Sequence, residues 1–270
     1  MSFTIITATY NCKSEIEDNI KNILSLKKNR LEIQWIVIDG GSFDGTKEKL
    51  MSELGSTIDY FESKKDNGIY DAWNKAIPHI VNDWVLFMGA GDTINENSLK
   101  VISNELEESS YKMVYGNVAL MNHGSCVKVF SKIDPEDYSN GRPSLPCHQG
   151  VLHHKSIFSY DSKFDISYKI AGDSKFLLLA LKKYKLKYID IEVAKMKMGG
   201  VSTSPDSCVK TMREICRLNN ELDIRIPKLK KYIFIFKMHV KSLIYRFCGG
   251  KFFQVYGKAR RIFFNGDNIY

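Results

Sequence analysis

The chain has 270 residues, 44% of them hydrophobic, which suits one large α/β domain or one domain with a tail. Its N-terminal segment lacks a basic region and a small-residue cleavage site, and no run of about 18 apolar residues occurs. Neither a secretory signal nor a membrane-spanning helix is therefore expected. The six cysteines are scattered and form no CxxC pair, which favours reduced thiols over a disulfide framework or a zinc site.

The net charge of +8 is distributed unevenly along the chain. Residues 225–270 contain eleven Lys and Arg against one acid, a charge of +10, which leaves the first 224 residues at about −2. This asymmetry favours a catalytic body with a basic anchoring tail. An enzyme acting on nucleic acid would more often be basic near its active site.

The first third of the chain alternates between strand and helix patterns. The segment 33–39 is a nearly continuous apolar run, as expected for a strand buried on both faces of a parallel sheet. Pro78 is expected to stop the third helix, and Asp44 to cap the second. The predicted elements are strand 3–9, a helix from 16 to a turn at 28–30, strand 33–39, helix 44–54, strand 57–61, helix 69–80 and strand 84–88.

Polar residues close three of these strands. In a sheet built from right-handed βαβ units, ligands bind beyond the carboxyl ends of the strands. We therefore expect the residues 7–10, 39–42 and 89–92 to converge on one edge as a binding site.

The second part of the chain has shorter strand patterns and fewer helices. Strand-like patterns are predicted over 113–129, 149–153 and 188–194, with a Leu-rich helix over 171–184. Gly199, Gly200 and Ser202 form a turn ahead of a helix predicted to begin near Pro205.

Four motifs appear in order and carry a resemblance to a known family. They are Thr7-Ala8-Thr9-Tyr10-Asn11, the segment Ile36-Val37-Ile38-Asp39-Gly40-Gly41-Ser42-Phe43-Asp44-Gly45-Thr46, the segment Asp66-Asn67-Gly68-Ile69-Tyr70-Asp71-Ala72-Trp73-Asn74-Lys75-Ala76, and Gly89-Ala90-Gly91-Asp92. Over about residues 2–204 the chain resembles the family 2 glycosyltransferases, and most closely the branch that builds bacterial O-antigen, colanic acid and capsule repeats. The resemblance implies a GT-A fold: a Rossmann-like, mostly parallel α/β sheet, a small acceptor-side sheet and a C-terminal helical tail. We divide the chain into a catalytic domain, 1–204 (nucleotide-sugar half 1–112, acceptor half 113–204), and a tail, 205–270.

The resemblance implies that the nucleotide-sugar donor binds to the N-terminal half. Asp39 takes the position of the family's contact to the base, where a carboxylate can accept the N3–H of uracil, and Tyr10 can stack on the ring. Asp71, Asn74 and Lys75 are spaced to share one helix face, where an Asp71–Lys75 surface ion pair is the alternative to a donor-sugar role. The residues expected at the donor site are Thr7, Thr9, Tyr10, Asp39, Gly41, Asp71, Asn74 and Lys75.

A metal site is expected beside the donor diphosphate. The family usually has an Asp-x-Asp motif here, but this chain has Gly89-Ala90-Gly91-Asp92, so Asp92 is the one expected carboxylate ligand. Mg²⁺ or Mn²⁺ neutralises a leaving diphosphate and accepts carboxylate and phosphate oxygens. The glycines also leave open a catalytically silent sugar-nucleotide-binding protein.

The acceptor half contains the predicted base. Inverting transfer needs a carboxylate that takes the proton of the acceptor hydroxyl, and Asp173 in Ala171-Gly172-Asp173-Ser174 matches the family's acidic motif. A helix cap is the alternative role of Asp173. His148 and Gln149 are expected in the acceptor pocket, and Gly199, Gly200 and Ser202 in a lid loop over the donor.

The tail is predicted to form a basic amphipathic helix. This pattern suits the surface of an anionic bilayer, whereas docking on the body or pairing in a homodimer would use the same stripe. After Gly249-Gly250 a second segment repeats the pattern with Phe252, Phe253, Tyr256, Ile262 and Phe263. The apolar stripe of the first segment comprises Leu229, Tyr232, Ile233, Phe236, Val240, Leu243, Ile244 and Phe247.

The sequence thus predicts an inverting hexosyltransferase at the inner face of the cytoplasmic membrane. The resemblance implies a UDP-sugar donor and an undecaprenyl-diphosphate-linked saccharide acceptor, with dTDP-rhamnose as an alternative donor. No nucleic-acid partner is expected, because the basic tail carries no motif that reads bases.

Overall fold

The computed structural model describes residues 1–106, 110–158, 163–200 and 207–248, and it leaves the side chain of Cys248 undescribed. Predictions for Ser202, for the helix start near Pro205 and for the second tail segment lie outside these residues. The described chain forms two compact units, one of residues 1–120, 129–132 and 146–197 and one of residues 121–128, 133–145 and 198 onward. The proposed boundary near residue 204 stays a prediction.

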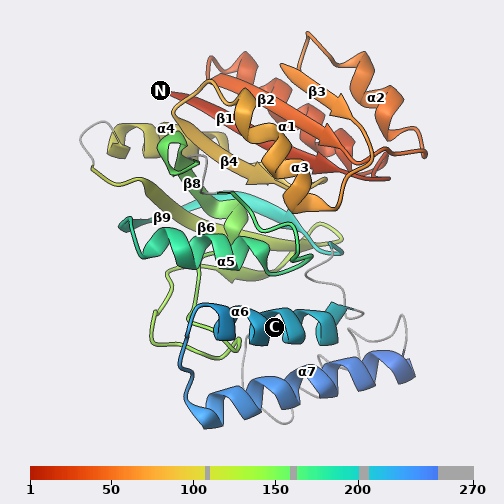
Figure 1. Cartoon of the computed structure of the whole chain (residues 1–270). Coiled ribbons are helices and arrows are strands. Elements are labelled where there is room, and N and C mark those ends of the chain that lie inside the picture. The colour runs from red at the N-terminus through yellow and green to blue at the C-terminus, as the bar shows by residue number, and fades with distance from the viewer. Residues whose placement is uncertain (107–109, 159–162, 201–206, 249–270) are drawn as a thin grey trace. The chain divides into compact units, whose positions relative to one another are not determined.

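A mixed sheet is the centre of the first unit (Figure 1). Its strand order is β3-β2-β1-β4-β8-β6-β9-β5, with β7 paired to β6. The four strands β3, β2, β1 and β4 are parallel neighbours, whereas β8 runs antiparallel to β4 and β6. The predicted Rossmann-like α/β fold is confirmed. The strands are β1 Ser2–Thr9, β2 Glu32–Asp39, β3 Tyr60–Ser63, β4 Trp84–Met88, β5 Thr93–Ile94, β6 Met113–Asn122, β7 Ser125–Phe130, β8 Val151–His154 and β9 Leu186–Lys197.

The register of the parallel strands brings their carboxyl ends to one edge. Thr9 pairs with Asp39, Asp39 with Ser63, and Thr7 with Met88 one residue before the Gly89–Asp92 loop. All five residues of β4 and the last five of β2 are buried, as a continuous apolar run predicts. The expected convergence of the polar strand ends is confirmed.

The helices follow the predicted order. The bounds of α2, β3 and α3 differ from the predicted ones. Helix α2 ends at Ser52 and β3 starts at Tyr60, and the segment between them contains an isolated bridge from Leu54 to Ile58. After α3 the chain tightens into a 3-10 turn at Ile77–His79, where Pro78 lacks the N–H that a longer α-helix needs. The helices of this unit are α1 Ile16–Lys28, α2 Thr46–Ser52, α3 Ile69–Ala76, α4 Glu96–Leu106 and α5 Gly172–Leu181, with 3-10 turns at Ile77–His79, His148–Gly150 and Lys155–Ile157.

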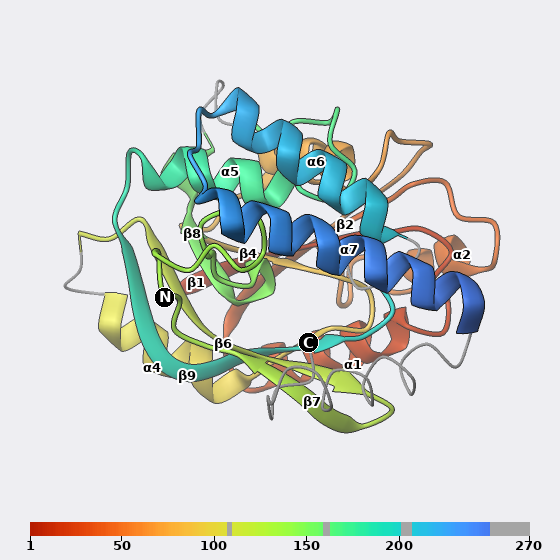
Figure 2. The same ribbon diagram turned by 90° about the horizontal axis from the view of Figure 1, so that it is seen from below.

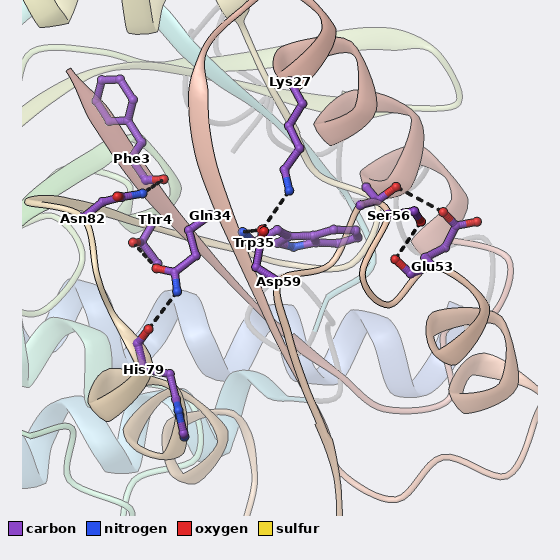
Figure 3. Close-up of polar contacts among 11 residues, drawn as sticks. Phe3, Thr4, Lys27, Gln34, Trp35, Glu53, Ser56, Asp59, His79 and Asn82 are labelled. Carbon is purple, nitrogen blue, oxygen red and sulfur yellow. Dashed lines mark hydrogen bonds and ion pairs between the residues drawn. The ribbon is translucent and has the colours of Figure 1, made fainter.

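Polar contacts tie the segments near the amino ends of β1, β2 and β4 to one another (Figure 3). Gln34 accepts from Thr4 at 2.7 Å and donates to the carbonyl of His79 at 2.8 Å, while Asn82 donates to the carbonyl of Phe3 at 2.7 Å. Asp59 accepts from Lys27 at 2.8 Å. These side chains hold the scaffold together at the edge opposite the expected site.

The second unit contains α6 Cys208–Glu221 and α7 Lys228–Cys248, which pack side by side (Figure 2). Phe234 is its buried anchor on α7, and the ring covers Gly141, where an added Cβ would lie 2.3 Å from Phe234 Cδ1. Asn219 of α6 donates to the carbonyl of the same glycine at 2.7 Å. The loop around Gly141 therefore joins both helices.

Most of the predicted apolar stripe of α7 is exposed instead of packed inside this unit. Leu229, Tyr232, Phe236, Leu243 and Phe247 each expose more than half of their surface. The helix docks through Phe234, which lies outside that stripe.

In the part of the chain that the structure describes, no helix combines the length and apolarity needed to cross a bilayer. The described cysteines are free thiols there as well: Cys12, Cys126, Cys147, Cys208 and Cys216.

Candidate functional site

Asp39 organises the loop that follows β2. Its side chain is fully buried, and Oδ1 accepts from Thr9 Oγ1 at 3.1 Å and from Ser42 Oγ at 2.5 Å. Oδ2 accepts from Ser63 Oγ at 2.7 Å and from the N–H groups of Gly41 and Ser42 at 3.1 and 2.9 Å. Burial opposes ionisation of Asp39, yet the hydrogen bonds from Ser42, Ser63 and Thr9 hold its pKa below the ordinary value.

Thr7 in β1 and Tyr10, directly after β1, differ in exposure. Thr7 is buried and accepts from the indole N–H of Trp35 at 3.0 Å, so its hydroxyl serves the core. Tyr10 is 61% exposed, and Phe43, 80% exposed, meets it edge to face at 6.3 Å between ring centroids. Phe43 was not among the residues predicted for the donor site. Its position as an aromatic residue in a loop of Gly, Ser and Asp could have indicated an exposed ring there.

Asp44 and Gly45 start α2 in a way that differs from the expectation. Gly45 occupies the cap position with φ +94°, and Asp44 Oδ1 accepts from Thr46 N and Oγ1 at 3.0 and 2.6 Å. The other oxygen of Asp44 accepts from Lys13 N at 3.1 Å, which ties the loop after β1 to this turn. The carboxylate of Asp44 thus bridges two loops of the carboxyl edge.

The side chains on α3 make contacts within the protein. Asp71 accepts from the backbone and side chain of Asn67 at 2.9 and 3.2 Å, and Lys75 Nζ lies 3.7 Å from it. Asn74 donates to the carbonyl of Phe164 at 2.8 Å and accepts from its N–H at 2.9 Å. Asn74 therefore joins α3 to the segment that precedes α5.

Asp92 is a buried single carboxylate. Oδ2 accepts from Gly89 N at 2.9 Å, and Oδ1 accepts from Lys197 N of β9 at 2.8 Å. Burial raises the pKa of Asp92 to about 6, against the lowering effect of these two N–H groups. With few donors around it, Asp92 is held in its ionised form far less firmly than Asp39.

Close packing around Gly89 and Gly91 explains why glycines occupy these two positions of the Gly89–Asp92 motif. A Cβ at Gly89 would lie 2.9 Å from Asp92 Oδ2, and a Cβ at Gly91 would lie 2.7 Å from Lys197 Cδ. Gly91 also has φ +84°. The glycines let the Asp92 carboxylate and the stem of Lys197 pack against the loop, and a larger residue at either position would require these side chains to shift.

Asp92 fits a divalent ion as one ligand among several. No group of three His, Cys, Asp or Glu residues gathers anywhere in the described ranges. Each oxygen of Asp92 accepts one N–H and keeps lone-pair capacity for a cation. Mg²⁺ takes one or two carboxylates and completes its shell with phosphate and water oxygens, which suits this donor set.

Asp173 stands in the first turn of α5 and contacts the first turn of α3. The hydroxyl of Tyr70 donates to Asp173 Oδ1 at 3.2 Å, and Ser174 N donates to the same oxygen at 2.7 Å. Close by, Lys169 Nζ donates to the carbonyl of Asn67. The structure therefore brings the Asp66–Ala76 motif and the predicted base together, although Tyr70 and Asp173 are 103 positions apart in the sequence.

His148 lies inside an aromatic cluster with Trp73 and Phe87, at ring-centroid distances of 5.0 and 5.2 Å. Burial lowers the pKa of His148 to about 4, although the charge of Asp173 acts in the opposite direction. The imidazole is thus neutral at pH 7. Gln149 is half-buried and accepts from Cys147 Sγ at 3.2 Å.

The described part of the predicted lid loop is Gly199 and Gly200. Gly199 has φ +117°, and an added Cβ at either glycine would meet no atom within 4 Å. A lid role for these glycines stays a prediction.

The Rossmann-like fold and its strand-end loops can be compared with those of known proteins. Residues 4–133 match the model of glycosyl transferase family 2. This match includes the four motifs, and the resemblance to family 2 glycosyltransferases is thus confirmed over residues 4–133.

Curated relatives include an uncharacterized glycosyltransferase of Mycoplasma pneumoniae, 28% identical over 42% of this chain and 40% of that protein. A PGL/p-HBAD biosynthesis glycosyltransferase of Mycobacterium bovis is 23% identical over 75% of this chain and 79% of that protein. The match spans less than half of the length of the two Mycoplasma relatives, at 40% and 44%.

Solved structures confirm the GT-A fold. S. aureus TarS 1–349 in complex with UDP-GlcNAc has a TM-score of 0.60 at 18% identity, covering 97% of this chain and 78% of that one. The mannosyltransferase PcManGT from Pyrobaculum calidifontis, in complex with GDP-Man and Mn²⁺, has a TM-score of 0.60 at 15% identity, covering 97% and 81%.

Proposed function

We propose that this chain transfers a hexose, with inversion, from a UDP-sugar to a lipid-diphosphate-linked saccharide during assembly of a surface polysaccharide of the O-antigen type. The observation that carries the proposal is the contact of Asp173 with Tyr70, because it joins a carboxylate of the acceptor half to the donor-side motif helix. In the transfer, Asp173 takes the proton of the acceptor hydroxyl while that oxygen bonds to the anomeric carbon. The bond from that carbon to the diphosphate breaks, and the electron pair leaves with UDP.

For the nucleotide, we propose that Tyr10 and Phe43 provide an aromatic surface for the base. Both rings are exposed beyond the carboxyl ends of β1 and β2. Stacking of a base on an aromatic ring is worth about 1–3 kcal/mol and tolerates different bases. The backbone of the Asp39 loop then lies beside the ring, and its shape is fixed by the Asp39 carboxylate. Thr9, Gly41, Asp71, Asn74 and Lys75 are proposed to support the same donor site.

For the metal, Asp92 is the protein carboxylate proposed to meet Mg²⁺ or Mn²⁺ beside the donor diphosphate. A divalent ion there would offset the charge of the leaving diphosphate. The structure of PcManGT contains Mn²⁺ with its GDP-Man donor, which supports metal use in this fold.

For the acceptor, we propose that His148 and Gln149 shape the pocket next to Asp173. The aromatic cluster around His148 keeps this wall of the site rigid and the imidazole neutral.

The tail supports a location on the inner face of the cytoplasmic membrane. The exposed apolar side chains of α7 alternate with lysines, and a surface of this composition suits an anionic bilayer. A homodimer through the same surface is the alternative.

Thermal shift measurements test the nucleotide. UDP with Mn²⁺ is expected to raise the melting temperature through binding to the native state, and dTDP and GDP to raise it less. Phe43→Ala should leave the melting temperature of the free protein unchanged, since the ring is exposed, and should remove most of the UDP effect. A larger stabilisation by dTDP would replace the UDP assignment with a dTDP-sugar donor.

A second candidate is a catalytically silent sugar-nucleotide-binding protein, favoured by the buried state of Asp92. It would bind UDP-sugar and release no UDP with any acceptor. A panel of radiolabelled sugar nucleotides on synthetic lipid-diphosphate acceptors separates the two candidates.

A further inference from the structure

Tyr70 is fixed in place by its ring. The side chain is 4% exposed, and its ring meets those of Trp73 and Phe164 at centroid distances of 5.5 and 5.9 Å. It also lies flat against the backbone of α5, because a Cβ at Gly172 would come 2.7 Å from ring atom Cε2. Any larger residue at 172 would force the ring or the helix start to move.

The hydroxyl of Tyr70 reaches two groups next to the predicted base. Its single proton is shared between two acceptors, the carbonyl of Ile170 at 2.6 Å and Asp173 Oδ1 at 3.2 Å. Burial, and then the negative charge of Asp173, raise the pKa of Tyr70 well above its usual value, so the phenol keeps its proton at neutral pH.

The hydrogen bonds to the carboxylate of Asp173 fall on one oxygen. Tyr70 and Ser174 both donate to Oδ1, and across the described ranges no hydrogen bond ends on Oδ2. A carboxylate held by one oxygen has a defined rotamer and offers the second oxygen to a ligand.

We propose that Tyr70 is a positioning residue, whose hydroxyl fixes the Asp173 carboxylate so that Oδ2 is presented to the acceptor hydroxyl. The inference rests on the proposed role of Asp173 as the base. It also explains why a tyrosine stands in the donor-side motif: the helix that carries Asp71 orients the base of the acceptor half.

Two other titratable side chains near Asp173, those of His148 and Lys175, do not take the positioning role proposed for Tyr70. His148 faces Asp173 from the turn before β8, and it is neutral because burial lowers its pKa to about 4. Lys175 on the same helix is 2.7 Å from Asp165 and forms an ion pair with that carboxylate.

Tyr70→Phe tests the proposal, because it removes the hydroxyl and keeps the ring. We expect kcat to fall about tenfold, the scale of one hydrogen bond to a charged group, with the KM for the donor unchanged. The melting temperature should fall by only a few degrees, from the lost bond to Ile170. Tyr188→Phe is the matched control, since its hydroxyl also contacts a carboxylate, Asp190, at 2.9 Å, and there kcat should be unchanged.

A double-mutant cycle separates positioning from a structural effect. If Tyr70 acts through Asp173, then Tyr70→Phe should cost almost nothing further in the Asp173→Asn background, measured by slow incorporation of radiolabelled sugar. The same loss in both backgrounds, or an unchanged kcat for Tyr70→Phe, would overturn the proposal. Full turnover by Asp173→Asn alone would instead remove the base on which it rests.

Discussion

At the scale of single residues, Asp39 and Asp92 differ in how their carboxylates are held. Asp39 is the last residue of buried strand β2, and Asp92 lies in the loop after buried strand β4. The side chain of Asp39 accepts five hydrogen bonds, whereas that of Asp92 accepts two. The pKa of Asp39 is consequently lowered and that of Asp92 is raised to about 6. The number of nearby hydrogen-bond donors determines whether the pKa of the carboxyl is lowered or raised, and the sequence does not reveal this number.

Asp39→Asn is expected to destabilise the protein by about 2 kcal/mol or more at pH 7. The amide NH₂ of asparagine cannot accept hydrogen bonds, so donors that the carboxylate satisfies would lose their acceptor. The pKa of Asp39 is lower in the folded state than in the unfolded chain. Its stabilising contribution is therefore complete above the unfolded value of about 4 and is lost as the pH falls through the folded value.

The measurement is the free energy of unfolding of wild type and Asp39→Asn at several pH values. The difference between them should shrink in acid. A difference that stays constant from pH 7 to pH 3 would show that the ionised carboxylate is not what stabilises this loop.

At the scale of secondary-structure elements, the strands, helices and loops that carry the candidate site were largely predictable from the sequence. The apolar run predicts β2, the helical periodicity predicts α3, and the glycine-rich segments predict the loops after the strands. Each of these predictions uses only residues that are close together in the sequence. The contacts between Asn74 and Phe164 and between Tyr70 and Asp173 were not predictable. They join segments about 90 and 100 residues apart, and no local pattern encodes such a pairing.

Asn74 of α3 and Asn22 of α1 make the same kind of backbone contact, so the two can be compared to test whether Asn74 also supports donor binding. Asn74 exchanges two hydrogen bonds with the backbone of Phe164, and Asn22 of α1 exchanges two with the backbone of Ile94. Replacing either by Ala should cost about 2 kcal/mol of stability, because backbone groups lose their partners. Both effects are measured by denaturant unfolding.

Donor affinity then distinguishes the two asparagines. If Asn74 supports the donor site, Asn74→Ala should weaken UDP-sugar binding in calorimetry, and Asn22→Ala should not. Equal donor affinity in the two variants would restrict Asn74 to a structural role.

At the scale of the whole molecule, the chain combines a sheet-based unit with a helical unit that presents apolar side chains to solvent. The charge asymmetry of the sequence predicts a separate basic tail over residues 205–270, and this division stays a prediction. The face on which α7 packs was not predicted, because Phe234 and the stripe residues are equally apolar in sequence. In the structure, the ring of Phe234 covers Gly141, a contact between distant segments that the sequence does not reveal.

Point substitutions on α7 test membrane binding more cleanly than removal of the tail, which would also remove Phe234. Phe236→Ser with Phe247→Ser should reduce flotation with vesicles containing phosphatidylglycerol by about tenfold, because each removes apolar area from the bilayer. Wild type should bind neutral phosphatidylcholine vesicles weakly. Equal flotation of variant and wild type, with a shift from dimer to monomer in the variant, would assign the surface to dimerisation.

The most direct test of the central claim is transfer of radiolabelled sugar from a UDP-sugar to a lipid-diphosphate acceptor by wild type and Asp173→Asn. The account predicts product with wild type. It predicts a loss of at least about a hundredfold in kcat for the variant, the lower end of what a general base supplies, with UDP binding retained. Product formation by Asp173→Asn at the wild-type rate would contradict it.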